Sequence, residues 1–302
     1  MASSQSNNYY IICEDLFKIY KIADLEVVAL RGLDLKVKLG ELMAIVGASG
    51  SGKTTLLNIL GGLDIPSAGR VTIGEKDLFK MSDHDLLNYR RQDVGLIWQQ
   101  VGRNLVPYLS ALQNVELPLI LLGWPARKRR KRAKEMLEAV GLAARQHHRP
   151  ERLSGGEQQR VAIAVALVHN PPLLLADEPS GELDSQTAET IYSVFRSLNE
   201  TYGVTIVIVT HDINIMEKVN RIVTVRDGRT SLEAIRRPQF RQPGTGPGGI
   251  PDEFIVLDNA GRLQIPKDYL EKLNLKERVK VLLAKDHITV WPEENHPEED
   301  KR

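Results

Sequence analysis

One short loop limits the possible folds of this 302-residue chain more strongly than any other segment. It matches the pattern G-x-x-x-x-G-K-[ST] directly after the apolar run Leu42–Val46, and its residues are Gly47, Ala48, Ser49, Gly50, Ser51, Gly52, Lys53 and Thr54. Glycines in such a loop let backbone N–H groups surround phosphate oxygens, and the positive end of the following helix points at the same place. A glycine-rich turn with a solvated lysine is the alternative, but the strand before the loop favours a phosphate site. We expect Lys53 to contact the β- and γ-phosphates of a nucleotide and Thr54 to offer its hydroxyl to Mg²⁺.

A second apolar run, Leu173–Ala176, ends in two carboxylates, Asp177 and Glu178. A carboxylate at the end of a buried parallel strand beside a phosphate loop can hold Mg²⁺, and this role is assigned to Asp177. Glu178 can orient or deprotonate an attacking water molecule. Alone, two carboxylates after an apolar run more often begin a loop. Together with the phosphate loop, they predict nucleotide hydrolysis.

The order of apolar and polar runs predicts a layered α/β domain over residues 1–235. Short β-type runs alternate with helical stretches, and a third strand candidate, Val204–Val209, is rich in β-branched residues. A more helical region over about 83–169 separates the first two strand candidates and is expected to form a helical subdomain.

Three segments are expected to follow this domain. Residues 236–251 are rich in Pro and Gly without apolar periodicity, which predicts a linker. Residues 252–292 regain β-type alternation around one short helix and are expected to form a small β-rich module. Residues 293–302 are polar and predict a frayed tail.

Charge and composition exclude several classes of protein. The formal net charge of +1 gives no global attraction to nucleic acid or to an acidic membrane surface. Cys13 is the only cysteine, so the chain can form neither an internal disulfide nor a cysteine-built zinc site. No apolar run approaches the roughly 18 residues of a membrane-spanning helix, and Met1–Asn8 lacks signal-peptide features. We therefore expect a cytoplasmic protein that does any membrane work through a partner chain.

A third motif, Leu153–Arg160, predicts a second anion site. Ser154 and the backbone amides of Gly155 and Gly156 stand before a helix whose positive end favours an anion. Ser154 and Glu157 also form the sequence of a capping box, which is the structural alternative. Both can hold, because the cap and the anion site use the same helix end.

The same eight residues match the signature sequence of ABC nucleotide-binding domains. From Tyr9 to Arg229 the chain resembles such a domain, and more narrowly the branch of MacB-type macrolide and lipoprotein-release systems and the cell-division ABC ATPase. The other matching stretches are Leu56–Asp64, Val94–Gln100, Asn114–Leu119 and Val209–Asp212. The resemblance implies a P-loop NTPase fold of the ABC type with a helical subdomain, ATP and Mg²⁺ as ligands, and ATP hydrolysis.

The resemblance also implies roles for single residues. Gln99 resembles the glutamine that senses Mg²⁺ and water, His211 resembles the histidine that contacts the γ-phosphate, and Asp184 lies in the loop that crosses to the other subunit. Tyr20 stands where the family places an aromatic ring against adenine, although a tyrosine there could equally be surface packing. Thr55 is expected among the ATP contacts. The expected metal set is Thr54, Gln99 and Asp177, and the expected catalytic set is Lys53, Gln99, Glu178 and His211.

Two positions depart from the family pattern. Glu182 stands where the branch usually has Asn or Ala, so a further carboxylate enters an anionic region and can alter the dimer contact. Val165 stands where Arg is usual after the signature helix. Neither position belongs to the hydrolytic set.

The segment Arg127–Arg132 is a run of six basic residues. One interpretation is a patch for nucleic acid or anionic lipid. The other is the solvated face of a helix whose apolar side is Met136, Leu137 and Val140. Because relatives in this branch are also charged here, we favour the solvated face.

The segment Leu257–Leu275 resembles a second family, the swapped-hairpin AbrB and MazE type, which is usually a dimeric DNA-binding module. From Asp252 to Arg302 there are nine Lys and Arg against twelve Asp and Glu, a net charge of −3. Duplex binding needs clustered positive charge, for which Arg262 and Lys267 are the best candidates. We therefore expect a dimerisation module and consider nucleic acid an improbable partner.

One chain carries one phosphate loop and one signature, and the resemblance implies that a second copy completes each ATP site. We expect a head-to-tail homodimer that binds two ATP and drives a transmembrane permease partner at the inner face of the cell membrane. The resemblance favours export, lipoprotein extraction or mechanotransmission over nutrient import. The competing hypothesis is a soluble, ATP-switched regulator that binds DNA through its C-terminal module.

Overall fold

The computed structural model describes residues 9–22, 25–181, 183–235, 252–257, 261, 263–276 and 278–292. Glu182, Arg262, the linker 236–251 and the tail 293–302 lie outside the described residues, so the predictions made for them stay predictions. The chain divides into two compact units, residues 1–254 and 255–302. We call the first the ATPase unit, after the activity that its sequence predicts, and the second the C-terminal unit. None of the described helices is long and apolar enough to cross a membrane.

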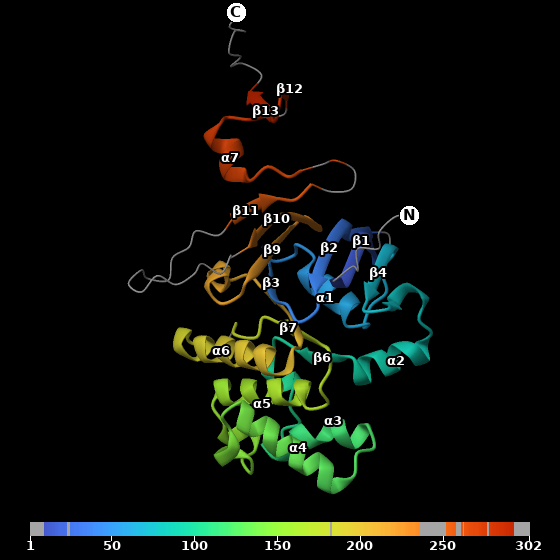
Figure 1. Cartoon of the computed structure of the whole chain (residues 1–302), viewed down its shortest axis with the longest axis vertical. Helices are drawn as coiled ribbons and strands as arrows, with labels where there is room; N and C mark the ends of the chain where they lie inside the picture. Colours follow the sequence, from blue (N-terminus) through green and yellow to red (C-terminus); the bar gives the residue numbers. More distant parts are fainter. Residues whose placement is uncertain are drawn as a thin grey trace, which may run out of the picture. The chain divides into compact units, whose positions relative to one another are not determined.

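A seven-stranded sheet is the centre of the ATPase unit (Figure 1). Its strand order is β11 (Asp252–Ile255), β10 (Arg229–Ile235), β9 (Arg221–Arg226), β3 (Leu42–Val46), β8 (Thr205–Thr210), β7 (Leu173–Asp177) and β6 (Val94–Ile97). The strands from β9 to β6 are parallel to their neighbours, and β10 is antiparallel to β9. Every residue of β3, β7 and β8 is buried, which explains their unbroken apolar runs.

Alternate residues of β3 face two different hydrophobic cores. Met43 and Ile45 pack in a core with helix α1 (Lys53–Leu60) and with a second, antiparallel sheet. Leu42, Ala44 and Val46 pack in the other core, to which the four helices between Ala111 and Tyr202 contribute. The period of two along a strand thus divides one apolar run between two cores.

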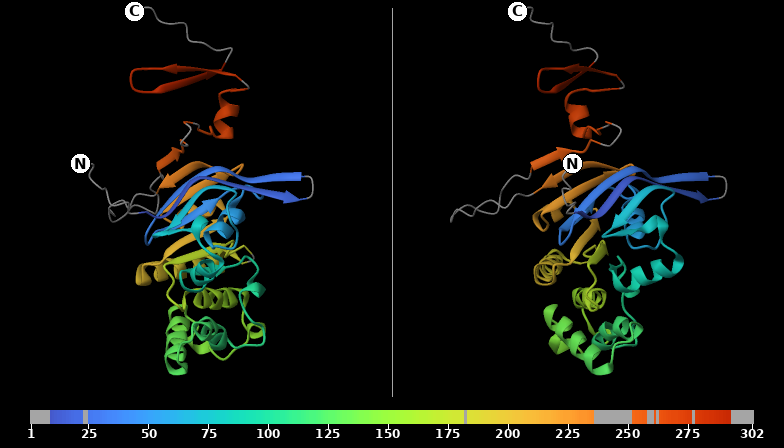
Figure 2. Two further views of the ribbon diagram at one scale, coloured as in Figure 1. Left: turned by 90° about the vertical axis from the view of Figure 1, so that its right-hand side faces the viewer. Right: turned by 45° about the vertical axis from the view of Figure 1, so that its right-hand side comes forward.

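The antiparallel sheet has the order β2-β1-β4-β5. Its strands are β1 (Tyr9–Ile22), β2 (Leu25–Lys38), β4 (Ala68–Ile73) and β5 (Lys76–Asp77). Residues of β2 from Leu30 to Val37 alternate between buried and partly or fully exposed, apart from a shift at Gly32–Leu33, so one face of this sheet closes the first core. Figure 2 shows this sheet on the side of the unit away from the helices between Ala111 and Tyr202.

Helices cover the opposite face of the central sheet (Figures 1 and 2). The helices against this face are α5 (Gly155–Leu167) and α6 (Ser185–Tyr202), whereas α3 (Ala111–Leu121) and α4 (Ala126–Ala139) pack against α5 on its side away from the sheet. Helix α2 (Asp83–Gln92) lies before β6. The helical region expected over 83–169 therefore also contains a strand, β6, because Val94–Ile97 pairs with β7 inside the central sheet. Short 3-10 turns complete the unit: η1 (Leu78–Lys80), η2 (Val101–Arg103), η3 (Ala143–Arg145), η4 (Pro150–Arg152) and η5 (Ile213–Glu217).

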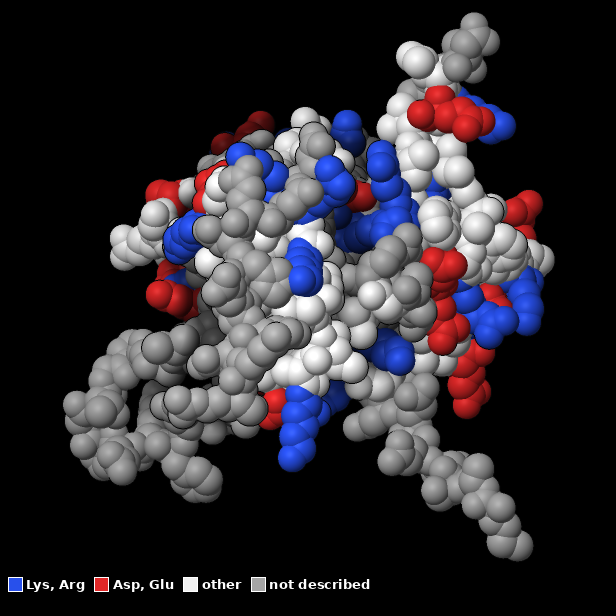
Figure 3. Space-filling model, turned by 90° about the horizontal axis from the view of Figure 1, so that it is seen from above, with Lys and Arg blue, Asp and Glu red and all other residues white. Residues whose placement is uncertain are grey.

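The C-terminal unit has little core of its own. It contains helix α7 (Lys267–Lys272) and the antiparallel hairpin of β12 (Val279–Leu283) and β13 (Ile288–Pro292). Leu275 is the only buried side chain among the residues of this unit that the structure describes, and all five residues of β12 are exposed. Charges of both signs occur on the face of the molecule seen in Figure 3, in keeping with the net charge of +1.

Candidate active site

The phosphate loop joins the buried strand β3 to helix α1, as the sequence predicts. Gly52 caps the helix with a φ of 103°, in the left-handed region that favours glycine. A Cβ atom there would lie 2.5 Å from the carbonyl oxygen of Ala29, and one at Gly47 would lie 2.2 Å from that of Val225. These two glycines are therefore required by the close approach of neighbouring backbone.

Lys53 lies almost buried beneath the loop. Its Nζ donates hydrogen bonds to the carbonyl oxygens of Gly47, at 2.8 Å, and Ala48, at 2.9 Å. Burial lowers the pKa of the Lys53 ammonium, while the nearby carboxylates of Glu178 and Asp177 raise it. The buried hydroxyl of Ser51 has no hydrogen-bond partner in the described part of the chain. An unpartnered hydroxyl, a lysine and helix N–H groups together fit a phosphate group.

Asp177 is the last residue of β7 and lies close to Thr54. Burial raises the pKa of the Asp177 carboxyl, and a hydrogen bond with the Thr54 hydroxyl lowers it. Glu178 also raises this pKa, and Lys53 lowers it. The structure thus brings together the hydroxyl and the carboxylate that the sequence assigns to Mg²⁺.

Glu178 is held by two side chains from the end of β8. Thr210 Oγ1 donates to Glu178 Oε2 at 2.9 Å, and His211 Nδ1 lies 2.8 Å from Glu178 Oε1. The Glu178 backbone has a φ of 46° and its N–H donates to the carbonyl of Val209. Sequence reasoning names Glu178 and His211 but misses Thr210, whose only signal is its position directly before His211.

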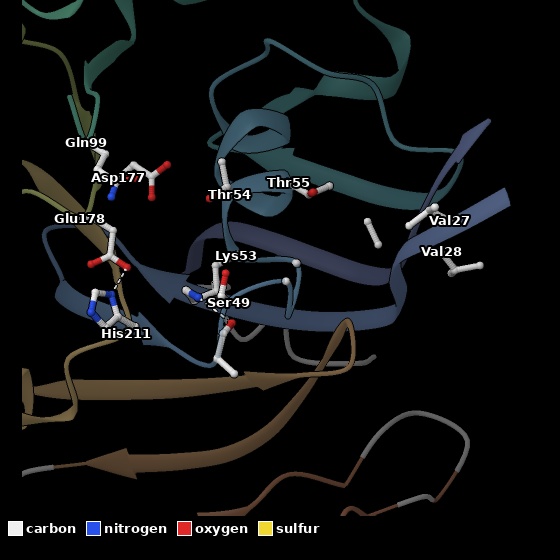
Figure 4. A pocket seen from close by; sticks show the side chains of 14 residues that line it. Val27, Val28, Ser49, Lys53, Thr54, Thr55, Gln99, Asp177, Glu178 and His211 are labelled. Atoms are coloured by element: carbon white, nitrogen blue, oxygen red, sulfur yellow. Dashed lines mark hydrogen bonds and ion pairs between the residues drawn. The ribbon is translucent and has the colours of Figure 1, made fainter. Parts of the chain in front are cut away.

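One cavity of about 730 Å³ contains these groups (Figure 4). The valines lie at one end and the acidic residues with His211 at the other. The lining residues are Val27, Val28, Ala29, Ala48, Ser49, Gly50, Gly52, Lys53, Thr54, Thr55, Gln99, Asp177, Glu178 and His211. Most of the residues expected to contact ATP therefore line one cavity, although Gly47 and Ser51 of the loop are not among its lining residues. The contribution of Val27–Ala29 had no signal in the sequence.

Tyr20 is not among the residues that line this cavity. Its hydroxyl donates to Asp64 Oδ2 at 2.7 Å, and the ammonium of Lys18 lies 4.8 Å from the centre of its ring. Burial, and then the hydrogen bond to Asp64, raise the pKa of Tyr20. The structure thus shows what holds the ring, and the adenine contact stays a prediction.

The signature residues line a different cavity, of about 230 Å³. Ser154 caps α5, where its Oγ accepts from the Glu157 N–H and its own N–H donates to the Glu157 carboxylate. A Cβ atom at Gly156 would lie 2.2 Å from Thr187 Cγ2, so this glycine allows α5 to approach α6. The lining residues are Ser154, Gly156, Glu157, Arg160, Gln186, Thr187, Thr190 and Ile191, and none of them lines the first cavity.

Two further positions from the sequence have clear structural surroundings. Asp184 caps α6, and its carboxylate accepts from the backbone N–H of Thr187 at 2.9 Å and from its hydroxyl at 2.6 Å. Val165 packs against the core beneath the helices. An apolar side chain thus occupies the position where the family pattern has Arg.

The large cavity combines a glycine-rich loop, a lysine, hydroxyls and carboxylates, which are the groups that bind a nucleoside triphosphate and its metal ion. The fold and the site therefore define a P-loop nucleotide hydrolase. The sequence profile described as ABC transporter matches residues 30–181. This chain belongs to the ABC transporter family and is one of its ATP-binding and ATP-hydrolysing subunits.

Individual relatives agree with this family. An uncharacterized ABC transporter ATP-binding protein of Thermotoga maritima is 50% identical over 223 residues, which cover 74% of this chain and 93% of that protein. The lipoprotein-releasing system ATP-binding protein LolD of Pseudoalteromonas translucida is 44% identical over 227 residues, which cover 75% of this chain and 97% of that protein. The match to the permease-containing MacB of Brucella melitensis, at 43% identity, spans only 34% of that longer protein.

Solved structures agree as well. The dimeric structure of the ATP-binding cassette MJ0796 of Methanocaldococcus jannaschii, in a post-hydrolysis state with ADP and Pi, has a TM-score of 0.69. It is 43% identical and covers 76% of this chain and all of that one. The bound nucleotide of that relative confirms the expected class of ligand. A second profile, MraZ protein, putative antitoxin-like, matches residues 252–298, which is compatible with the small C-terminal module. The DNA-binding regulator is not favoured.

Proposed function

We propose that two copies of this chain enclose two ATP molecules head to tail, each between the phosphate loop of one copy and the signature of the other. The observation that carries this proposal is the separation of the two cavities. Each has polar groups at a helix N-terminus, and the two cavities share no lining residue. Their residues can meet on one ATP only when a second copy supplies one of them.

The residues divide the work of hydrolysis by position. Thr54, Gln99 and Asp177 would hold Mg²⁺, which would offset negative charge on the phosphate oxygens. Lys53 and Ser154 of the opposing copy would contact the transferred phosphoryl group. Glu178 would accept a proton from the attacking water, and His211 would contact the terminal phosphate. Because both Glu178 oxygens are engaged by Thr210 and His211, these two residues orient the carboxylate before the water binds.

The closing motion would act on a transmembrane permease at the inner face of the cell membrane, as the kinship with LolD and MacB supports. The C-terminal unit would associate with its counterpart in the second copy and keep the two ATPase units close between cycles. Its exposed apolar side chains support this role, because burial against a second copy would supply the missing core. The Pro/Gly-rich segment 236–251 gives the units reach and raises their effective concentration.

Mixing two inactive variants tests the shared site. Lys53→Ala should weaken ATP binding, whereas Ser154→Arg should spare binding and block closure. In a mixed dimer one site combines both defects, and the other combines an intact loop with an intact signature. An equimolar mixture should therefore recover up to about a quarter of wild-type hydrolysis if the two sites act independently.

Ser110→Arg is the matched control, because Ser110 forms the same capping box on α3 outside the signature. Loss of a cap alone costs about 1 kcal/mol of stability, so this variant should keep hydrolysis. If the mixed dimers form, as labelled subunits would show, and yet neither hydrolysis nor ATP-dependent closure returns, the ATP site does not span two copies.

A further inference from the structure

The corner between α3 and α4 exposes apolar side chains directly beside an unusual concentration of positive charge. Ile120, Leu121 and Trp124 are 47%, 65% and 37% exposed. The corner is well formed: the N–H groups of Leu122, Gly123 and Trp124 all donate to carbonyls of the last turn of α3. These apolar side chains are therefore held at the surface by a capped helix end.

Helix α4 follows the corner and carries seven basic residues against two acidic ones, a net charge of +5. Arg127, Arg130, Lys131 and Lys134 share one exposed face through their spacing of three and four residues. Among the described residues, Arg127, Lys128, Arg130 and Lys134 have no acidic partner within 4.0 Å. Arg129 and Arg132, in contrast, turn toward the body of the unit, at Glu116 and at the ring of Tyr202. We call the corner and this face together the α4 basic edge.

The charges on α4 have the opposite distribution to the one that stabilises a helix, in which acidic residues lie near the N-terminus. Its first turn has no acidic residue and no side-chain cap, and its only carboxylates, Glu135 and Glu138, lie in the second half. Cations near a helix N-terminus and like charges one turn apart both destabilise a helix. An ordinary solvated helix face relieves such repulsion by mixing signs. Among the described residues, Glu135 is the only carboxylate of α4 within 4.0 Å of a basic side chain, and its partners are Lys131 and Arg132. An external anionic surface would relieve both effects.

We infer that the α4 basic edge docks on the surface of an anionic lipid bilayer. Basic residues beside an exposed tryptophan and aliphatic side chains are the combination that binds the headgroup region, with the apolar groups entering the interface. A nucleic acid would use the positive charges but would leave Ile120 and Leu121 exposed to water. This inference rests on the proposed location of the chain beside a membrane, and no permease is needed to test it.

Vesicle flotation with the full chain tests the docking directly. The chain should bind vesicles of equal parts phosphatidylglycerol and phosphatidylcholine, bind phosphatidylcholine alone far more weakly, and lose binding as salt rises. The triple variant Arg127→Glu, Arg130→Glu and Lys134→Glu should lower the affinity on the order of a hundredfold. A control with the same change in net charge reverses three exposed residues elsewhere, Arg70→Glu, Arg91→Glu and Lys272→Glu, and should stay within a few-fold of wild type.

Trp124 provides a second measurement at the corner itself. With Trp98 and Trp291 replaced by phenylalanine, the emission of Trp124 should shift to the blue on anionic vesicles, and Trp124→Ser should weaken binding several-fold. If both triple variants lost the same affinity for anionic vesicles, binding would depend on net charge alone and the inference would be wrong. The inference would also be wrong if the emission of Trp124 did not shift, if the chain bound no vesicles, or if it bound duplex DNA more tightly and the first triple variant abolished that binding. None of these outcomes affects recovery of ATP hydrolysis by mixing, so a failure here leaves the proposed function standing.

Discussion

The ATPase unit and the C-terminal unit differ most in what they bury. In the ATPase unit two hydrophobic cores lie on the two faces of a sheet whose central strands have no exposed residue. In the C-terminal unit Leu275 alone is buried among the described residues, while large apolar side chains such as Leu283, at 84% exposure, face solvent. The first unit is stabilised by its own packing, whereas the described residues of the second bury too few apolar side chains to form a comparable core.

This contrast predicts that all hydrolytic chemistry belongs to the ATPase unit. Glu178→Gln should keep ATP binding and lower turnover roughly a thousandfold, about 4 kcal/mol, because the base is removed and the phosphate cradle is kept. The ATP-bound dimer should accumulate on size exclusion. Glu200→Gln, on the exposed side of α6, is the control and should hydrolyse ATP normally. Wild-type-like turnover by Glu178→Gln would remove this residue from its role.

The next largest effect should come from the core beneath the helices. Phe195 is completely buried there, so Phe195→Ala should destabilise the ATPase unit by about 3 kcal/mol, measured from its calorimetric transition. Phe195→Leu, which keeps most of the volume, should cost less. A loss below 1 kcal/mol for the alanine variant would mean that this core is looser than the burial indicates.

Truncation tests the other side of the comparison. Removing the chain after Arg237 should weaken ATP-free dimerisation in sedimentation several-fold, while turnover at saturating ATP stays within about twofold. A second truncation, after Ile255, keeps edge strand β11 in the central sheet and removes the C-terminal unit except for Ile255. If only the shorter chain were impaired, the lost edge strand would be the cause. If both truncated chains dimerised as well as the full chain, the C-terminal unit would not hold the two copies together between cycles.

The smallest effect should follow from Leu283→Ala. Because this side chain is exposed within its own copy, the change should shift unfolding of the ATPase unit by less than about 0.5 kcal/mol. It should still weaken ATP-free self-association if β12 packs against a second copy. If Leu283→Ala changed the unfolding free energy of the ATPase unit but not self-association, Leu283 would contact the ATPase unit, and the proposal would be contradicted.

The sequence alone determined the parts of the site that are short and contiguous. Gly47, Gly52 and Lys53 define the phosphate loop. Ser154 and Glu157 define the capped start of α5. Both features can be predicted because turns and caps depend on neighbours a few residues away. The strand candidates around Leu42, Leu173 and Val204 were identified for a similar reason, since a fully buried parallel strand is apolar throughout.

Only the tertiary structure decided which distant segments meet. In the folded chain Thr210 and His211 contact Glu178. Val27–Ala29 line the apolar end of the large cavity. The hydroxyl of Tyr20 donates to Asp64. The fold also separates the signature from the phosphate loop of the same copy. Such contacts depend on strand order and on the packing of whole layers, which no local pattern specifies. Burial likewise depends on the neighbours that a fold supplies, so β12 has the alternation of a strand and yet lies exposed within its own copy.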